Sequence, residues 1–191
     1  MPLPPLTKIE AKTAAEICAR FELSEPAAAL PRDGLSPAAF LERLIEGRHV
    51  LDALGFLAHA LPKREAVGWA ASCARLAGGP KSPEQQTALE AVERWRLEPS
   101  EELRRAAMAA AEKAQLNNPA GCAALAVFFT GGSLAPPDVP VVPPGEGLTA
   151  RAVAGAVLMA AVVSEPEKAE EKYQRFLEQG IAAAAGQDQG K

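Results

Sequence analysis

The chain has 191 residues, a net charge of -4, an apolar fraction of 48% and an aromatic fraction of only 5%. This length allows one domain with a real core, or two very small ones. Acidic and basic residues are interspersed without a basic stripe, so we expect no nucleic-acid partner. Alanine supplies much of the apolar content, and because it is a good helix former and a poor strand former, the composition favours an all-α fold.

Neither a membrane span nor a metal site is indicated by the sequence. The longest apolar run, residues 152–163, has 12 residues, short of the roughly 20 that cross a bilayer, and the start MPLPPLTKIE does not resemble a signal peptide. The cysteines, Cys18, Cys73 and Cys122, lie far apart without a CxxC pair, which disfavours disulfides and zinc. We therefore expect a cytoplasmic bacterial protein with no membrane insertion, metal or cofactor.

The N-terminal part is predicted to begin with a flexible leader and short helices. We expect the leader at residues 1–6, an amphipathic helix over 7–21 and a turn of helix over 24–30. Ser36 and Pro37 supply an N-cap and a first-turn proline, which predict a helix ending near residue 47.

Residues 48–76 are predicted to form a helical hairpin at the centre of the fold. Apolar residues recur at helical spacing up to Leu61, Pro62 ends the first helix and Lys63 opens the second. Both histidines and one of the two tryptophans lie in this segment.

The remaining sequence predicts further helices and a tail. Ser82 and Gln85 suggest a capping box, followed by helices over residues 83–97, 101–116, 119–129, 150–163 (capped by Thr149) and 165–181, with a disordered tail at 182–191. The helices over 119–129 and 150–163 are apolar on all sides, so they should be the central buried pair. The expected fold is all-α: one domain, residues 7–181, of about eight or nine helices in stacked, repeat-like hairpins.

A proline-rich strap, residues 131–147, joins the two apolar helices. Its five prolines between Pro136 and Pro144 favour a stiff polyproline II backbone. Four apolar side chains interleave with these prolines: Leu134, Val139, Val141 and Val142. They could be presented to a protein partner at low entropic cost, or the strap could cross the domain and pack its valines on the body.

Two polar groups on the hairpin are further candidates. Lys63, Arg64 and Glu65 form either a charged contact patch or a solvated helix start, whose basic residues oppose the helix dipole. His59 could act as a base or ligand with Asp52, but seven residues along a helix separate the two by about 10 Å. Structural roles for the histidines, inert buried thiols and core tryptophans are the competing interpretations.

Four segments, FLAHALPKREAVGWAASCAR, TGGSLAPP, LTARAVAGAVLMAA and EKYQRFLEQGI, resemble an uncharacterised family of small bacterial helical proteins, a domain of unknown function. The resemblance covers residues 19–181 and implies one compact helical fold, with a setting near type VI secretion genes. It assigns no catalytic residue. Gly68 departs from the family pattern, in which a bulkier residue precedes Trp69.

The leading functional expectation is a non-enzymatic protein-binding module: an adaptor, chaperone or accessory subunit, such as one of a bacterial secretion machine. A small-ligand-binding protein or enzyme with a site near His59 is one alternative. A structural homo-oligomer is the other.

Overall fold

The computed structural model describes residues 3–187, and regular structure in that part of the chain is entirely helical. The elements are α1 (Ala14–Cys18), α2 (Glu25–Ala28), α3 (Pro37–Glu46), α4 (Val50–Ala60), α5 (Lys63–Leu76), α6 (Pro83–Leu97), α7 (Glu101–Ala114), α8 (Pro119–Phe128), α9 (Leu148–Val162), a 3-10 turn η1 (Pro166–Lys168) and α10 (Ala169–Ala184). They pack around one continuous core. The prediction of a single all-α domain is confirmed.

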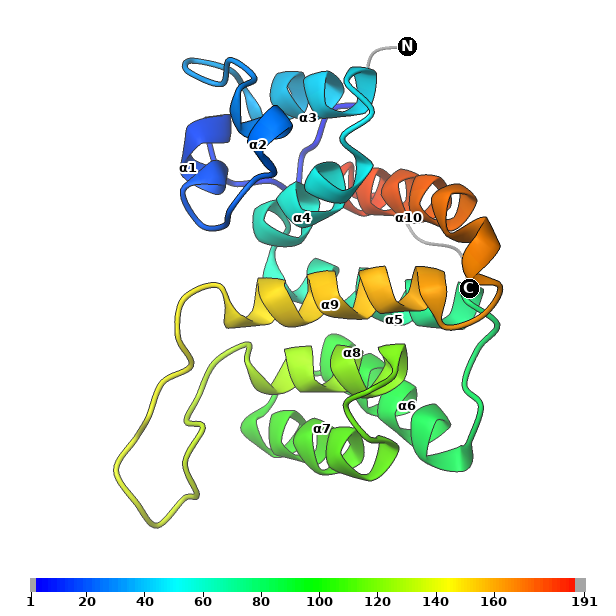
Figure 1. Ribbon diagram of the computed structural model, residues 1–191. Helices are drawn as coiled ribbons and strands as arrows, with labels where there is room; N and C mark the ends of the chain where they lie inside the picture. The colour runs from blue at the N-terminus through cyan, green and yellow to red at the C-terminus, as the bar shows by residue number, and fades with distance from the viewer. Residues whose placement is uncertain (1–2, 188–191) are drawn as a thin grey trace.

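α9 lies across the middle of the molecule, with α4 and α10 on one side and α6, α7 and α8 on the other (Figure 1). α8 packs against α9 and also contacts α5, α6 and α7. Ala123, Val127, Val153 and Val157 on these two helices have no exposed surface. The predicted central pair is therefore confirmed, and the small side chains of both helices let them approach closely.

Apolar residues of α9 are part of this core. Within residues 3–187 no single helix is both long and apolar enough to cross a bilayer. α9 and α10 pass that test only when they are counted together across a bend of 115°.

The helices predicted for residues 48–76 form as α4 and α5, but they do not pack against each other as a hairpin. Both contact α9 and α10 instead, and α5 holds α10 through Trp69. The indole Nε1 of Trp69 donates a buried hydrogen bond to the carbonyl of Phe176, at 2.9 Å. Gly180 lies against the same ring, and a Cβ there would come within 2.9 Å of both Leu57 and Trp69. The docking of α10 therefore requires the absence of a side chain at residue 180.

The unusual Gly68 is explained by its neighbour on α6. The side chain of Arg96 lies directly over Gly68, and a Cβ at residue 68 would overlap the guanidinium. Arg96 also pairs with Glu93 at 2.6 Å. The Arg96 side chain from α6 therefore fills the space that a bulkier residue at position 68 of α5 would occupy.

The predicted helix over residues 7–21 is wrong except for α1. Thr13 and Glu16 form a capping box that starts the helix only at Ala14. Upstream, the N–H of Lys8 donates to the carbonyl of Ala184 at 2.9 Å, so this backbone pairs with the end of α10 and not within a helix.

The starts of α9 and α10 also differ from the predictions, since α10 begins at Ala169, after the 3-10 turn η1, and not at residue 165. α9 begins at Leu148, after Gly147 in a left-handed conformation (φ 77°), and Thr149 is not its cap. The Thr149 hydroxyl donates to the carbonyl of Phe129 at 2.8 Å and so ties α9 to the end of α8.

Parts of the predicted leader and tail belong to the packed structure. Leu3 and Leu6 pack against the core, and α10 continues to Ala184, which is fully buried. Residues 1–2 and 188–191 lie outside the described residues.

Candidate functional site

The strap, residues 131–147, stands away from the helical body at one end of α8 and α9 (Figure 1). Val139, Val141 and Val142 are 48%, 74% and 50% exposed, while Leu134 is half-buried. The valines therefore face solvent and do not pack on the body. Three exposed β-branched side chains thus lie within four residues of one loop.

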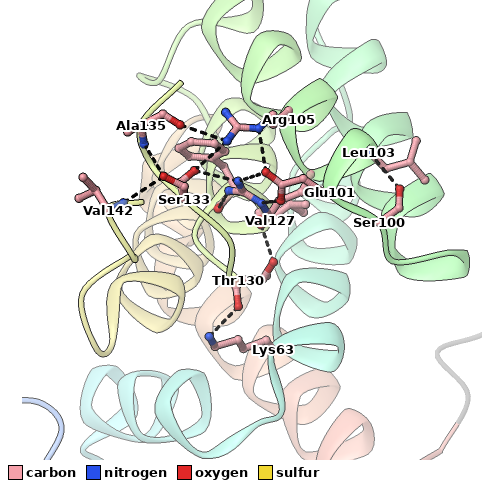
Figure 2. Close-up of polar contacts among 12 residues, drawn as sticks. Lys63, Ser100, Glu101, Leu103, Arg105, Val127, Thr130, Ser133, Ala135 and Val142 are labelled. Carbon is pink, nitrogen blue, oxygen red and sulfur yellow. Dashed lines mark hydrogen bonds and ion pairs between the residues drawn. The ribbon is translucent and has the colours of Figure 1, made fainter. Parts of the chain in front are cut away.

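The strap is closed on itself near its base. The hydroxyl oxygen of Ser133 accepts hydrogen bonds from the N–H groups of Ala135 and Val142, both at 3.1 Å. The N–H of Leu134 donates to the carbonyl of Val142 at 2.8 Å. These bonds join the outgoing and returning limbs, as Figure 2 shows for Ser133, so the free excursion is limited to residues 136–141.

The base of the strap is fixed to α7 by Arg104, whose side chain is only 4% exposed. Its guanidinium donates to both carboxylate oxygens of Glu101, at 2.6 and 2.8 Å, and to the carbonyls of Phe128 and Ser133. It also lies 4.5 Å from the centre of the Phe128 ring. A buried charge is stable only when it is paired and hydrogen-bonded, and Arg104 satisfies this condition by holding the strap.

A second arginine extends the anchor along the outgoing limb. Arg105 donates to Glu101 at 2.7 Å and to the carbonyl of Ala135 at 3.1 Å (Figure 2). Hydrogen bonds from Arg104, then the charges of both arginines, lower the pKa of Glu101 to about 2. Glu101 is therefore a carboxylate at neutral pH, and it forms the anchor together with Arg104 and Arg105.

Lys63 links the start of α5 to the residue that precedes the strap. Its Nζ donates to the carbonyl of Thr130 at 2.7 Å, immediately before the strap (Figure 2). This contact explains the basic residue at the start of α5, because its charge faces the carbonyl end of α8. Glu65 lies apart and pairs with Lys8 at 3.7 Å, and Arg64 is exposed.

Asp52 is hydrogen-bonded to Ser24 and not to His59. It accepts hydrogen bonds from the N–H and the hydroxyl of Ser24, both at 2.7 Å, and so holds the start of α2 against α4. Asp52 also lines an open hollow with Phe21 and His49. His59 is not part of that lining.

His59 is buried in a stack with Phe21, with ring centres 4.9 Å apart and planes inclined by 11°. Burial, together with the charges of Arg151 and Arg20, lowers its pKa to about 4. The imidazole is therefore neutral at neutral pH. The structure does not bring His59 and Asp52 into one polar site.

The cysteines and tryptophans largely occupy core positions. Trp69, Trp95 and Cys73 are buried, and burial raises the pKa of the Cys73 thiol well above its ordinary value. Cys122 differs from the expectation of a buried thiol, because it is half-exposed and its Sγ lies 3.2 Å from the carbonyl of Leu116.

The anchor was not among the predicted site residues. The spacing of Glu101, Arg104 and Arg105 places acid and base on one helix face, which is a signal for an ion pair. The carbonyl partners lie 24 to 30 residues further along the chain, and no sequence pattern relates them to the arginines.

Comparison with known protein families gives a match over most of the chain. The model of the Family of unknown function (DUF6931) matches residues 40–184. The chain belongs to this family. The matched range of DUF6931 runs from α3 to the end of α10 and includes α4, α5, the anchor and the strap. No curated protein and no solved structure matches the chain.

Proposed function

We propose that this DUF6931 protein is a non-enzymatic protein-binding module and that the tip of the strap contacts its partner. The observation that carries the proposal is the combination of exposed valines with a fixed base. Val139, Val141 and Val142 are each about half-exposed or more, on a loop that is closed by Ser133 and held by Arg104.

The closed base of the strap lowers the entropy that is lost on association. A flexible loop loses conformational freedom when a partner orders it, and this loss weakens binding. Here the hydrogen bonds at the base and the prolines along both limbs restrict the loop before a partner arrives. The apolar area of the valines can then contribute more fully to affinity.

An adaptor, a chaperone or an accessory subunit would use such a surface. The family resemblance noted from the sequence suggests a secretion machine as a setting. In each role the helical body carries the strap, and binding energy resides in a few side chains at its tip.

The test compares three baits of the full chain. One is wild type, one carries Val139→Ser, Val141→Ser and Val142→Ser, and the matched control carries Leu97→Ser, Leu116→Ser and Val163→Ser. The control residues are 80%, 44% and 46% exposed and lie outside the strap. Proteins captured from lysate are identified, purified and titrated against each bait by calorimetry.

We expect a purified partner to bind wild type and control equally and the strap variant at least about tenfold more weakly. Equal binding by all three baits would contradict the proposal. So would a chain that binds no protein but converts a small molecule.

A further inference from the structure

The returning limb of the strap, residues 140–144, has a strongly restricted backbone. Its sequence is Pro-Val-Val-Pro-Pro, and it contains no turn or bend. Each proline fixes φ near -65°, and the residue before a proline is confined to extended conformations, which applies to Val142 and Pro143. The limb is therefore biased toward a polyproline II helix before any partner binds.

This geometry aligns two prolines on one edge. A polyproline II helix has three residues per turn and rises about 3.1 Å per residue, so in that conformation Pro140 and Pro143 would lie on the same edge, about 9 Å apart. Both prolines are exposed, and Val141 between them is 74% exposed. A row of this kind, Pro-x-x-Pro, is the pattern that aromatic grooves recognise.

The limb is attached to the outgoing limb mainly through Val142. The N–H and the carbonyl of Val142 bond to Ser133 and Leu134. The N–H and the carbonyl of Val141 make no hydrogen bond to any part of the chain between residues 3 and 187. They remain available to a partner, as the backbone of a polyproline II ligand must be.

The charge of the strap adds a further property of the partner. Residues 131–147 contain two acids, Asp138 and Glu146, and no lysine or arginine. Complementary charge steers association and rejects partners of like charge. A partner groove with a basic rim therefore fits this loop better than an acidic one.

We propose that residues 140–144 are a polyproline II ligand, and that the partner is a protein groove lined by aromatic side chains, with a basic rim, that takes Pro140 and Pro143. This inference rests on the proposed function and names the class of partner.

The test uses the full chain, labelled with ¹⁵N and at the valine methyl groups, and purified SH3, WW and EVH1 domains as probes. These domains carry aromatic grooves for proline-rich segments. The variant is Pro140→Ala with Pro143→Ala, and the matched control is Pro136→Ala with Pro137→Ala on the outgoing limb. Resonances of Val141 and Val142 are followed as each domain is added.

We expect at least one domain to shift these resonances, the variant to bind about tenfold more weakly, and the control to bind as wild type does. The inference is overturned if no domain binds, or if the two pairs of prolines are interchangeable. It is also overturned if sedimentation detects a homodimer that the Pro140 and Pro143 changes dissociate, since the occupant would then be a second copy.

Failure of this inference can be told apart from failure of the proposed function. A captured partner whose binding needs the three valines but neither Pro140 nor Pro143 would leave the strap as a docking surface. Only the assignment of residues 140–144 as a polyproline II ligand would then be wrong.

Discussion

The two ends of α8 are connected to their neighbours in opposite ways. Four residues (115–118) join α7 to α8, whereas nineteen residues (129–147) join α8 to α9. In the short junction Asn118 is buried and acts on both helices. Its Nδ2 donates to the carbonyls of Ala114 and Gln115, at 2.6 and 2.8 Å, and its Oδ1 accepts from the N–H of Gly121 at 3.0 Å.

The comparison shows that a connection between core helices in this bundle can be made with four well-placed residues. The length of the strap is therefore not required by connectivity at the other end of α8. Loops of this length without regular structure are uncommon in compact domains and are usually functional. Stability should accordingly depend on the short junction and the anchor, and binding on the strap tip.

The largest effect is expected at the short junction, for Gly121→Ala. A Cβ at residue 121 would overlap the carbonyl oxygen of Gln115, which is backbone and cannot rotate away. We expect a loss of about 3–4 kcal/mol in the free energy of unfolding, measured with urea. The matched control is Gly155→Ala in α9, where a Cβ meets nothing within 4 Å. This substitution should raise the free energy of unfolding by up to about 1 kcal/mol. Equal effects at both glycines would refute the packing argument.

The next effect is expected at the anchor, for Arg104→Ala. The change leaves the carbonyl of Phe128 without its charged donor and that of Ser133 with only the longer bond from Arg105, at 3.4 Å. We expect a loss of about 2–3 kcal/mol in the free energy of unfolding, with faster amide exchange in the strap. Arg105→Ala, at a side chain that is 30% exposed, serves as the control and should lose less than about 1 kcal/mol. A strap that stays equally protected without Arg104 would show that the anchor does not hold it.

His59 should make the stability of the helical body depend on pH, and the strap should not share this dependence. Its pKa is about 4 in the folded chain and 6.5 as the ordinary value, so the unfolded chain takes up the proton first as the pH falls. Stability should therefore be complete above pH 6.5 and decrease by on the order of 2 kcal/mol toward pH 4. His59→Gln should flatten this decrease, and His49→Gln should leave it in place. A similar slope in both variants would assign the effect to other groups.

The smallest effect on stability is expected at the strap tip. Replacing Val139, Val141 and Val142 by serine removes only exposed apolar area, so the free energy of unfolding should change by less than about 0.5 kcal/mol. Thermal unfolding of the triple variant measures this. A large destabilisation would mean that the valines support the fold, and loss of binding by this variant could then not be assigned to the surface.

The sequence predicted those parts of the fold that depend on local signals. Ser36 with Pro37 and Asn118 with Pro119 start α3 and α8 as expected, because N-caps and first-turn prolines act within one turn of helix. The prediction was wrong at residues 7–13, where an apolar pattern suggested a helix. There the backbone bonds to the distant end of α10, and this tertiary contact prevails over local preference.

The candidate site was predictable only in part. Its prolines and valines are visible in the sequence, and so is their position between two apolar helices. Whether those valines face the body or solvent depends on bonds between Arg104 and the carbonyls at the base of the strap. Carbonyl groups are present at every residue, so no side-chain pattern predicts which of them will accept hydrogen bonds from an arginine.

The contact between Gly68 and Arg96 has a consequence for how sequences of this fold can diverge. The two positions share one volume between α5 and α6, so neither can change size independently. A large side chain at residue 68 requires a short one at residue 96, and a chain that acquires only the first change should be less stable than one that acquires both. In a double-mutant cycle, Gly68→Phe and Arg96→Ala should thus be non-additive, with the second substitution partly rescuing the first. Among relatives of this protein, substitutions at these two sites should occur together.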